Sequence, residues 1–243
     1  MAPISTSRRP LWVRALKSVA AILAGLLALP FLLAPLCLFG QPVSTLMLAR
    51  WATGARVERQ WLPLHAMAPS LPASVIAGED AQFCRHRGID LAGLREAMHD
   101  AETLSEMRGA STLSQQATKN LFLWPGRSYL RKLIEAPLAL WVDLVLGKRR
   151  LLEVYLNVAE WGPNGEFGAE AGARRAFGKS ARNLTPREAA LLAASLPNPR
   201  RRNPGRPGPA LSRLAGIYER RAAIPRLVAC LKPGPSHRDG LVL

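Results

Sequence analysis

The 243-residue chain has few cysteines, few aromatic residues and few acids. Its three cysteines, Cys37, Cys84 and Cys230, include no pair at CxxC spacing, which argues against a disulfide-rich scaffold and against a cysteine-based zinc site. Aromatic residues make up only 6% of the chain, but 49% of it is hydrophobic, and this apolar content excludes wholesale disorder. The length suits one domain, or one domain with an anchor.

Acidic residues are outnumbered by basic ones, 17 against 33, so the formal net charge is +16. Only six of the basic residues are lysines, and an arginine excess of this kind can simply reflect nucleotide composition. We therefore predict no nucleic-acid partner. The charge favours anionic partners in general, such as phosphates and acidic lipid surfaces.

One hydrophobic run decides the expected compartment. Residues 18–40 carry no charge and would span about 34 Å as a helix, enough for a hydrocarbon core of about 30 Å. Four basic residues and no acid precede the run, so the positive-inside rule predicts a cytoplasmic N-terminus. The alternative is a cleaved signal peptide, but the run is long and no small-x-small cleavage site closes it. Residues after 40 then lie outside the cytoplasm, where Cys84 and Cys230 could pair.

The pattern divides the chain into five segments. Residues 41–72 contain scattered prolines and two tryptophans, which is typical of a membrane-proximal stalk. The predicted segments are a cytoplasmic basic tail (1–17), a transmembrane helix (18–40), the stalk (41–72), a mostly helical domain (73–231) and a C-terminal tail (232–243).

Helix signals recur throughout the predicted domain. Asp90 has the position of an N-cap residue, and apolar residues recur with helical spacing over residues 129–146. Gly147 breaks that pattern. Thr185 and Glu188 form a capping box in front of an apolar helix that extends to residue 196.

Two adjacent carboxylates, Glu79 and Asp80, lie between apolar segments. Neighbouring helical residues point about 100° apart, so one carboxylate can face a cleft while the other makes a structural hydrogen bond. A carboxylate held against apolar groups has a raised pKa, which suits general acid–base catalysis. The alternative is an ordinary exposed pair. His86, a few residues on, is expected to pack or cap, because no second ligand stands at metal-binding spacing.

Two polar rows follow the start of a predicted helix near residue 111. Free backbone N–H groups at a helix start favour phosphate or sugar recognition, whereas the alternative is a solvated polar face. The residues leave both readings open. The rows consist of Ser111, Gln115 and Lys119, and of Thr112, Gln116 and Asn120.

A basic cluster surrounds a second glutamate. Arg131 and Lys132 precede Glu135 by four and three residues, so all three share one helix face, and Arg127 lies one turn earlier. One reading is a set of intrahelical ion pairs, and the other is a cationic site for a diphosphate beside a carboxylate. Further on, Glu153 and Asn157 lie one turn apart and are predicted to be part of the scaffold.

Five sequence motifs, in this order and spacing, resemble those of glycosyltransferase family 51, the peptidoglycan glycosyltransferases. The chain contains no S-x-x-K or K-T-G motif of the transpeptidase to which some members are fused, so we expect the monofunctional form. The matching strings, which cover about half of the chain, are EDAQFCRHRG, GASTLSQQATKN, RKLIEAPLALWVD, KRRLLEVYLNVAEWG and REAALLAASLPNPRRRNP.

The resemblance implies a mostly α-helical, lysozyme-like glycosyltransferase domain with a head lobe and a jaw lobe, on one N-terminal transmembrane helix. It also implies polymerisation of lipid II, a disaccharide-pentapeptide on undecaprenyl diphosphate, into β-1,4 glycan strands with inversion. Matched by motif, Glu79 is the general base and Glu135 lies near the diphosphate. Ile134 stands where many members have a further lysine. The remaining matched positions bind substrate: Ser111, Thr112, Gln115, Gln116, Lys119, Asn120, Arg127, Arg131 and Lys132.

The family's other properties are likewise expectations. The resemblance implies no required cofactor and no protein-held metal, and a divalent cation (Mg²⁺ or Mn²⁺) at the diphosphate is left open. The expected partners are lipid II, the growing glycan strand, the membrane, and cell-division or penicillin-binding proteins, with the catalytic domain on the periplasmic side of the inner membrane. The alternatives are a lysozyme-like lytic transglycosylase, which would need no cationic cluster, and a non-catalytic cell-wall scaffold, which would not need both glutamates.

Overall fold

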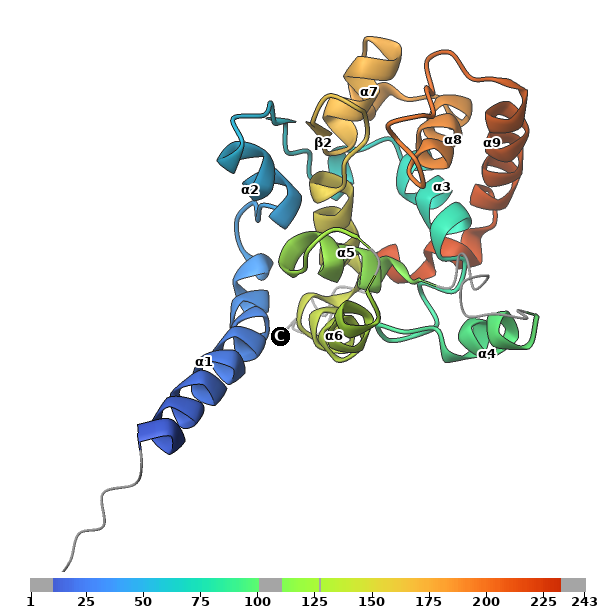
Figure 1. Cartoon of the computed structure of the whole chain (residues 1–243). Helices are drawn as coiled ribbons and strands as arrows, with labels where there is room; N and C mark the ends of the chain where they lie inside the picture. The colour runs from blue at the N-terminus through green and yellow to red at the C-terminus, as the bar shows by residue number, and fades with distance from the viewer. Residues whose placement is uncertain (1–10, 101–110, 127, 233–243) are drawn as a thin grey trace, which may run out of the picture.

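Helices form nearly all the regular structure in the described part of the chain (Figure 1). The computed structural model describes residues 11–100, 111–126 and 128–232. Its α-helices are α1 (Leu11–Leu33), α2 (Thr45–Ala52), α3 (Ser70–Glu79), α4 (Leu91–Asp100), α5 (Leu113–Phe122), α6 (Tyr129–Val158), α7 (Ala169–Phe177), α8 (Pro186–Ser195) and α9 (Pro209–Ala222). Short 3₁₀ helices are η1 (Ala34–Leu38), η2 (Leu64–Ala66), η3 (Ala181–Asn183) and η4 (Pro225–Leu231). Strands β1 (Glu58–Arg59) and β2 (Glu166–Phe167) pair in parallel. The prediction of a mostly helical chain is confirmed.

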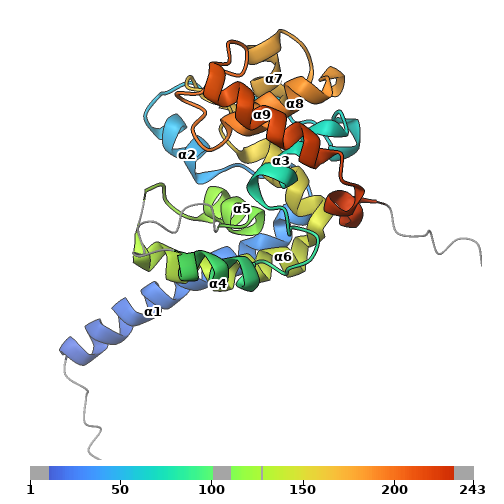
Figure 2. The same ribbon diagram turned by 90° about the vertical axis from the view of Figure 1, so that its right-hand side faces the viewer.

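Helix α1 projects away from the other helices in both Figure 1 and Figure 2. Among the described residues, Leu11–Leu38 is the one segment long and apolar enough to cross a membrane, which is consistent with a single-pass anchor. The helix begins seven residues before the predicted span of 18–40, so it includes Arg14 and Lys17. Nothing breaks the helix there, because residues 11–17 contain no proline or glycine, and long basic side chains can extend along a helix towards water.

The end of the anchor is held against α6. Pro35 stands in the first turn of η1, where a proline is tolerated, and Ala34 and Cys37 of η1 are buried. The indole nitrogen of Trp141, on α6, donates a hydrogen bond of 2.9 Å to the carbonyl of Phe31. The anchor and the domain are therefore joined by packing as well as by the chain.

The segment predicted to be a stalk, 41–72, is part of the folded domain. Met47, Leu62 and Leu71 are buried in the hydrophobic core. The side-chain amide of Asn157 holds the backbone of Leu62 at both ends, accepting from its N–H and donating to its carbonyl, each at 2.9 Å. The scattered prolines therefore shape a packed loop, and the expected stalk is wrong because local sequence does not reveal such tertiary burial.

Two groups of packed helices form the centre of the domain. Helices α3, α8 and α9 pack on one another, and Figure 2 shows α9 lying across the other two. Helix α5 packs along α6. The core includes nearly all of α8, where residues 189–194 are buried, and the apolar face of the second half of α6.

Several predicted helix boundaries are confirmed. Gly147 has a φ of +66° and bends α6, so that its second half turns away from the direction of the first. Glycine adopts this conformation without the steric cost that other residues meet. The Thr185–Glu188 capping box begins α8, and Asp90 accepts a hydrogen bond of 2.9 Å from the backbone of Gly93 at the start of α4.

Cys84 and Cys230 form a disulfide across 146 residues of sequence. Cys84 lies in the loop that follows α3, and Cys230 lies in η4. The bond therefore fastens the segment after Glu79 to the C-terminal part of the domain. Because disulfides persist in oxidising compartments, the bond agrees with a domain outside the cytoplasm.

Removing this disulfide is expected to lower stability by about 2–4 kcal/mol, because it closes a very long loop. The double variant Cys84→Ser/Cys230→Ser should show a lower denaturant midpoint than the wild-type protein under oxidising conditions. A reductant should lower the wild-type midpoint and leave that of the variant unchanged. Equal midpoints for the two oxidised proteins would contradict a stabilising role.

Candidate active site

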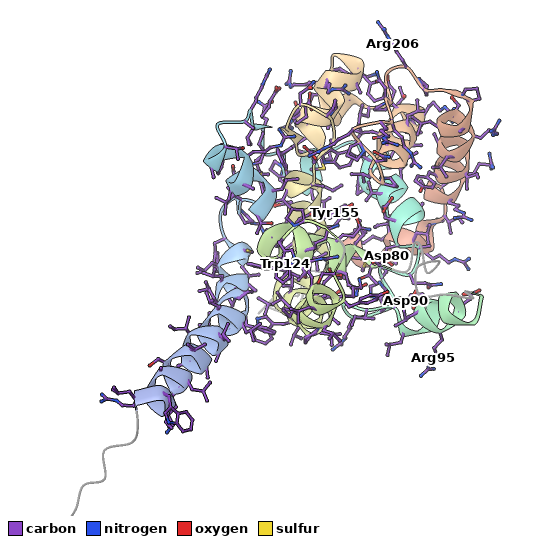
Figure 3. All side chains as sticks on the ribbon, in the orientation of Figure 1. Asp80, Asp90, Arg95, Trp124, Tyr155 and Arg206 are labelled. Atoms are coloured by element: carbon purple, nitrogen blue, oxygen red, sulfur yellow. A yellow bond between two sulfur atoms is a disulfide. The ribbon has the colours of Figure 1, made fainter. Side chains whose placement is uncertain are left out.

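The neighbouring carboxylates Glu79 and Asp80 point in different directions, as the sequence predicted. Asp80, the C-cap residue of α3, is buried and accepts a hydrogen bond of 2.9 Å from the backbone N–H of Leu113, the first residue of α5. Its carboxylate also lies 2.9 Å from Nε2 of His86. Asp80 therefore joins α3, the following loop and α5, and the expectation that His86 has a packing role agrees with this contact. Figure 3 labels Asp80 beside α5.

Glu79 is the half-buried carboxylate at the end of α3. Nε2 of Gln116, on α5, donates a hydrogen bond of 3.1 Å to Oε2 of Glu79. Burial raises the pKa of Glu79 above the ordinary value, and the Gln116 hydrogen bond opposes that rise. The positive charges of Arg202 and Lys119 also oppose it. Glu79 thus combines high proton affinity with nearby cations, which suits a general base.

Thr112 and Gln115, predicted to bind substrate, hold the helix instead. They form the capping box of α5, in which each side chain bonds the other residue's backbone N–H. Thr112 Oγ1 also donates to the carbonyl of Gly88 at 2.5 Å. Only 3% of Thr112 and 5% of Gln115 is exposed. The Thr112 hydroxyl and the Gln115 side-chain oxygen are thus used at the start of α5, because a helix start needs partners for its free N–H groups.

The other residues of the two polar rows are more accessible. Ser111, Gln116, Lys119 and Asn120 are all partly exposed. Burial lowers the pKa of Lys119, while the negative charge of Glu135 opposes this fall. The charges of both Glu79 and Glu135 act on Lys119, so its ammonium group lies within electrostatic range of both carboxylates.

The predicted basic cluster is formed around Glu135, whose side chain is almost fully buried. Arg131 Nη1 donates to Glu135 Oε2, and Lys132 Nζ donates to Glu135 Oε1 at 2.6 Å. Lys132 also donates to Ser111 Oγ at 3.0 Å, and 43% of its side chain is exposed. Two cations on one carboxylate leave an excess of positive charge, which suits an anionic ligand. The predicted phosphate contact Arg127 lies outside the described residues.

The surroundings of Glu135 do not fit a protein-held divalent cation. Both oxygens of its carboxylate are bonded to Arg131 and Lys132, and positive neighbours repel a metal ion. Within residues 11–100, 111–126 and 128–232, no three His, Cys, Asp or Glu side chains gather as a metal site. A cation that arrives with a diphosphate substrate stays a prediction.

Three contributors to the site were missed in the sequence analysis: Asp143, Tyr155 and Arg202. The carboxylate of Asp143 is buried and organises the loop and helices beside the site. Tyr155 donates a hydrogen bond of 2.9 Å from its hydroxyl to Oε1 of Gln116. Arg202 comes from the loop after α8, where it also donates to the carbonyl of Ala194 at 2.7 Å. The sequence signal for Asp143 and Tyr155 was a polar side chain among the apolar residues of a predicted helix.

The sequence pattern of the family described as Transglycosylase matches residues 45–224. This match covers the helical domain together with most of the segment that was expected to be a stalk. The chain belongs to the transglycosylase family.

Individual relatives show which type of transglycosylase the chain resembles. A biosynthetic peptidoglycan transglycosylase of Nitrobacter winogradskyi is 58% identical over 217 residues, which are 89% of this chain and 96% of the relative. Proteins of the same description are 56% identical in Rhodopseudomonas palustris (strain TIE-1), covering 89% of this chain and 92% of the relative, and 51% identical in Mesorhizobium japonicum, covering 87% and 89%. Because the identity is above 50% over most of both chains, this chain is a peptidoglycan glycosyltransferase. The predicted enzyme class is confirmed.

The variant Glu79→Gln is expected to be more stable than the wild-type protein at neutral pH. Because burial raises the pKa of Glu79, the folded state holds this proton more tightly than the unfolded state, so wild-type stability falls as the pH rises through the folded pKa. Glutamine does not ionise, so the variant does not lose this stability as the pH rises. The thermal midpoint should rise by about 2–4 °C for each kcal/mol recovered, and the gain should vanish below about pH 4.

Thermal unfolding of both proteins between pH 4 and pH 8 measures the effect. The matched control is Glu58→Gln, at an exposed position, and it should leave the midpoint unchanged across this range. A Glu79→Gln midpoint at or below that of the wild type at neutral pH would contradict the account of Glu79.

Proposed function

We propose that the protein polymerises lipid II into β-1,4 glycan strands and releases undecaprenyl diphosphate. The observation that carries the proposal is the pairing of one carboxylate of raised pKa, Glu79, with the cationic cluster around Glu135, while the charges of both glutamates act on Lys119. Proton abstraction from an alcohol needs a base, and departure of a diphosphate needs fixed positive charge. The names of the relatives support the peptidoglycan substrate.

In the proposed reaction, the 4-hydroxyl oxygen of the acceptor GlcNAc attacks the anomeric carbon of the donor MurNAc. Glu79 takes the hydroxyl proton as the new C–O bond forms. The bond from that carbon to the diphosphate breaks on the opposite face, so the configuration inverts. Lys132 and Lys119 stabilise the negative charge that develops on the diphosphate, with Arg131 holding Glu135 in place beside them.

A lipid-linked donor accounts for the anchor. The undecaprenyl chain stays in the bilayer, so an enzyme that uses it must work at the membrane surface. We propose a single-pass protein of the inner membrane, with a cytoplasmic N-terminus and a periplasmic, lysozyme-like domain of two lobes. The basic residues before the apolar run and the Cys84–Cys230 disulfide support this orientation. Cell-division and penicillin-binding proteins stay predicted partners.

Detergent-solubilised wild-type protein is expected to convert labelled lipid II into polymer that a muramidase shortens. Glu79→Gln should reduce polymer formation by at least about 100-fold, because the acceptor hydroxyl loses its base. The control Glu58→Gln should polymerise at the wild-type rate. Product length is read by electrophoresis of the labelled glycan.

Two results would contradict the proposed activity, and a third would contradict the proposed role of Glu79. Fragments released from preformed peptidoglycan, without polymer, would favour a lytic enzyme. Neither activity in a protein shown to be folded would favour a scaffold role. Normal synthesis by Glu79→Gln would remove Glu79 as the base.

Lys132→Ala is expected to lower kcat/KM for lipid II by more than about tenfold, since a partly exposed cation is lost beside the proposed diphosphate position. Steady-state rates over a range of lipid II concentrations measure the effect. Lys179→Ala is the control, because Lys179 pairs with Glu188 at the start of α8 and should not influence donor use. Unchanged kinetics in Lys132→Ala would exclude Lys132 from the phosphate site.

A further inference from the structure

A hydrogen-bonded chain leads from the interior of the domain to Glu79. The hydroxyl of Tyr155, on the second half of α6, donates to Oε1 of Gln116 at 2.9 Å. Nε2 of Gln116, on α5, donates to Oε2 of Glu79 at 3.1 Å. Three helices thus meet in one chain of polar contacts, and Figure 3 labels its inner end, Tyr155.

The Gln116 amide is held at both ends, by Glu79 and by Tyr155. A side-chain amide can turn over and present either its oxygen or its nitrogen to a neighbour, but an ionised carboxylate can only accept hydrogen bonds. The carboxylate therefore requires the amide nitrogen, and the Tyr155 hydroxyl stabilises that orientation by donating to Oε1. We propose that Tyr155 is a positioning residue, which locks the Gln116 amide so that Gln116 donates to Glu79 and holds its carboxylate ionised and aimed for proton abstraction.

The burial of Tyr155 suits it to this role. Only 2% of the residue is exposed, so water does not compete for its hydroxyl. Burial, together with the negative charge of Glu79, raises the pKa of Tyr155 well above the ordinary value. The phenol therefore keeps its proton around neutral pH, and this proton is available for Oε1 of Gln116.

The other groups that face Glu79 act through charge or packing. Lys119 from α5 and Arg202 from the loop after α8 act on Glu79 through their charge, and Asp80 opposes them. Tyr218 from α9 packs its ring against Gly78, where an added Cβ would come within 2.1 Å of a ring carbon. Together these groups set the local potential, but among the described contacts only Gln116 donates a hydrogen bond to the Glu79 carboxylate.

Tyr155→Phe tests the inference, which depends on the proposed role of Glu79 as the base. The change keeps the ring in the core and removes only the hydroxyl, so Oε1 of Gln116 loses its donor and the amide is held at one end only. We expect kcat for lipid II polymerisation to fall about tenfold, with KM within about twofold. The acidic limb of the kcat–pH profile should move up by about half a unit to one unit, because Glu79 loses a fixed donor that favours its ionised form.

A matched control and a double variant separate positioning from general damage. Tyr129→Phe, at an exposed tyrosine, should leave both kcat and the pH profile unchanged. Gln116→Leu should reproduce the loss, and adding Tyr155→Phe to it should cost no further activity, since the two residues act through one contact. Additive losses, or a lower kcat with an unshifted pH profile, would overturn the inference and leave Tyr155 with a structural role.

A titration without substrate keeps this test separate from the proposed function. The infrared carboxyl band of Glu79, identified by its absence in Glu79→Gln, should titrate about half a unit to one unit higher in Tyr155→Phe than in the wild type. This shift would support the positioning role of Tyr155 even if the wild-type protein made no polymer from lipid II. Absence of polymer would count against the proposed function alone. An unchanged titration of Glu79 would overturn the positioning role.

Discussion

The buried carboxylate of Asp143 is the interaction on which the arrangement of the site depends. One of its oxygens accepts hydrogen bonds from the backbone of Gly88 at 2.7 Å, from Ser114 at 2.6 Å and from Lys148 at 2.6 Å. These donors come from the loop after α3, from α5 and from the residue after the bend in α6. A buried charge without such partners would cost several kcal/mol, so the three segments are held in one arrangement. Glu79, Gln116 and Tyr155 keep their separations as a consequence.

This arrangement gives the two glutamates different properties. Glu135 is almost fully buried, and both its oxygens are bonded to cations, so it balances the charge of its own helix. Glu79 faces an uncharged amide and is affected by cations only at longer range. One carboxylate can therefore exchange a proton while the other keeps positive charge concentrated nearby. The separation of a base from a cationic cluster is what a reaction with an alcohol nucleophile and an anionic leaving group requires.

The helix that carries the cationic cluster, α6, also contacts the end of the anchor. Trp141 and Glu135 both lie on the first half of α6, and Trp141 holds the end of α1 through the carbonyl of Phe31. Because a helix is stiff over two turns, the contact between Trp141 and Phe31 also fixes the position of the cationic cluster relative to the end of α1. The disulfide between Cys84 and Cys230 adds a second constraint, on the loop that follows Glu79. Both contacts thus restrain the site.

Local sequence determined the helix signals, because capping and glycine conformations depend on residues within a few positions: the capping box at Thr185 and the bend at Gly147 were both predictable. The five motifs also predicted the enzyme class and identified Glu79 as the candidate general base. Sequence alone could not identify the stalk as core, the pairing of Cys84 with Cys230, or the use of Thr112 and Gln115 as caps. Arg202 and Tyr155 reach the site from distant segments, and only tertiary structure decides such contacts, since burial and hydrogen-bond partners depend on residues far apart in the chain.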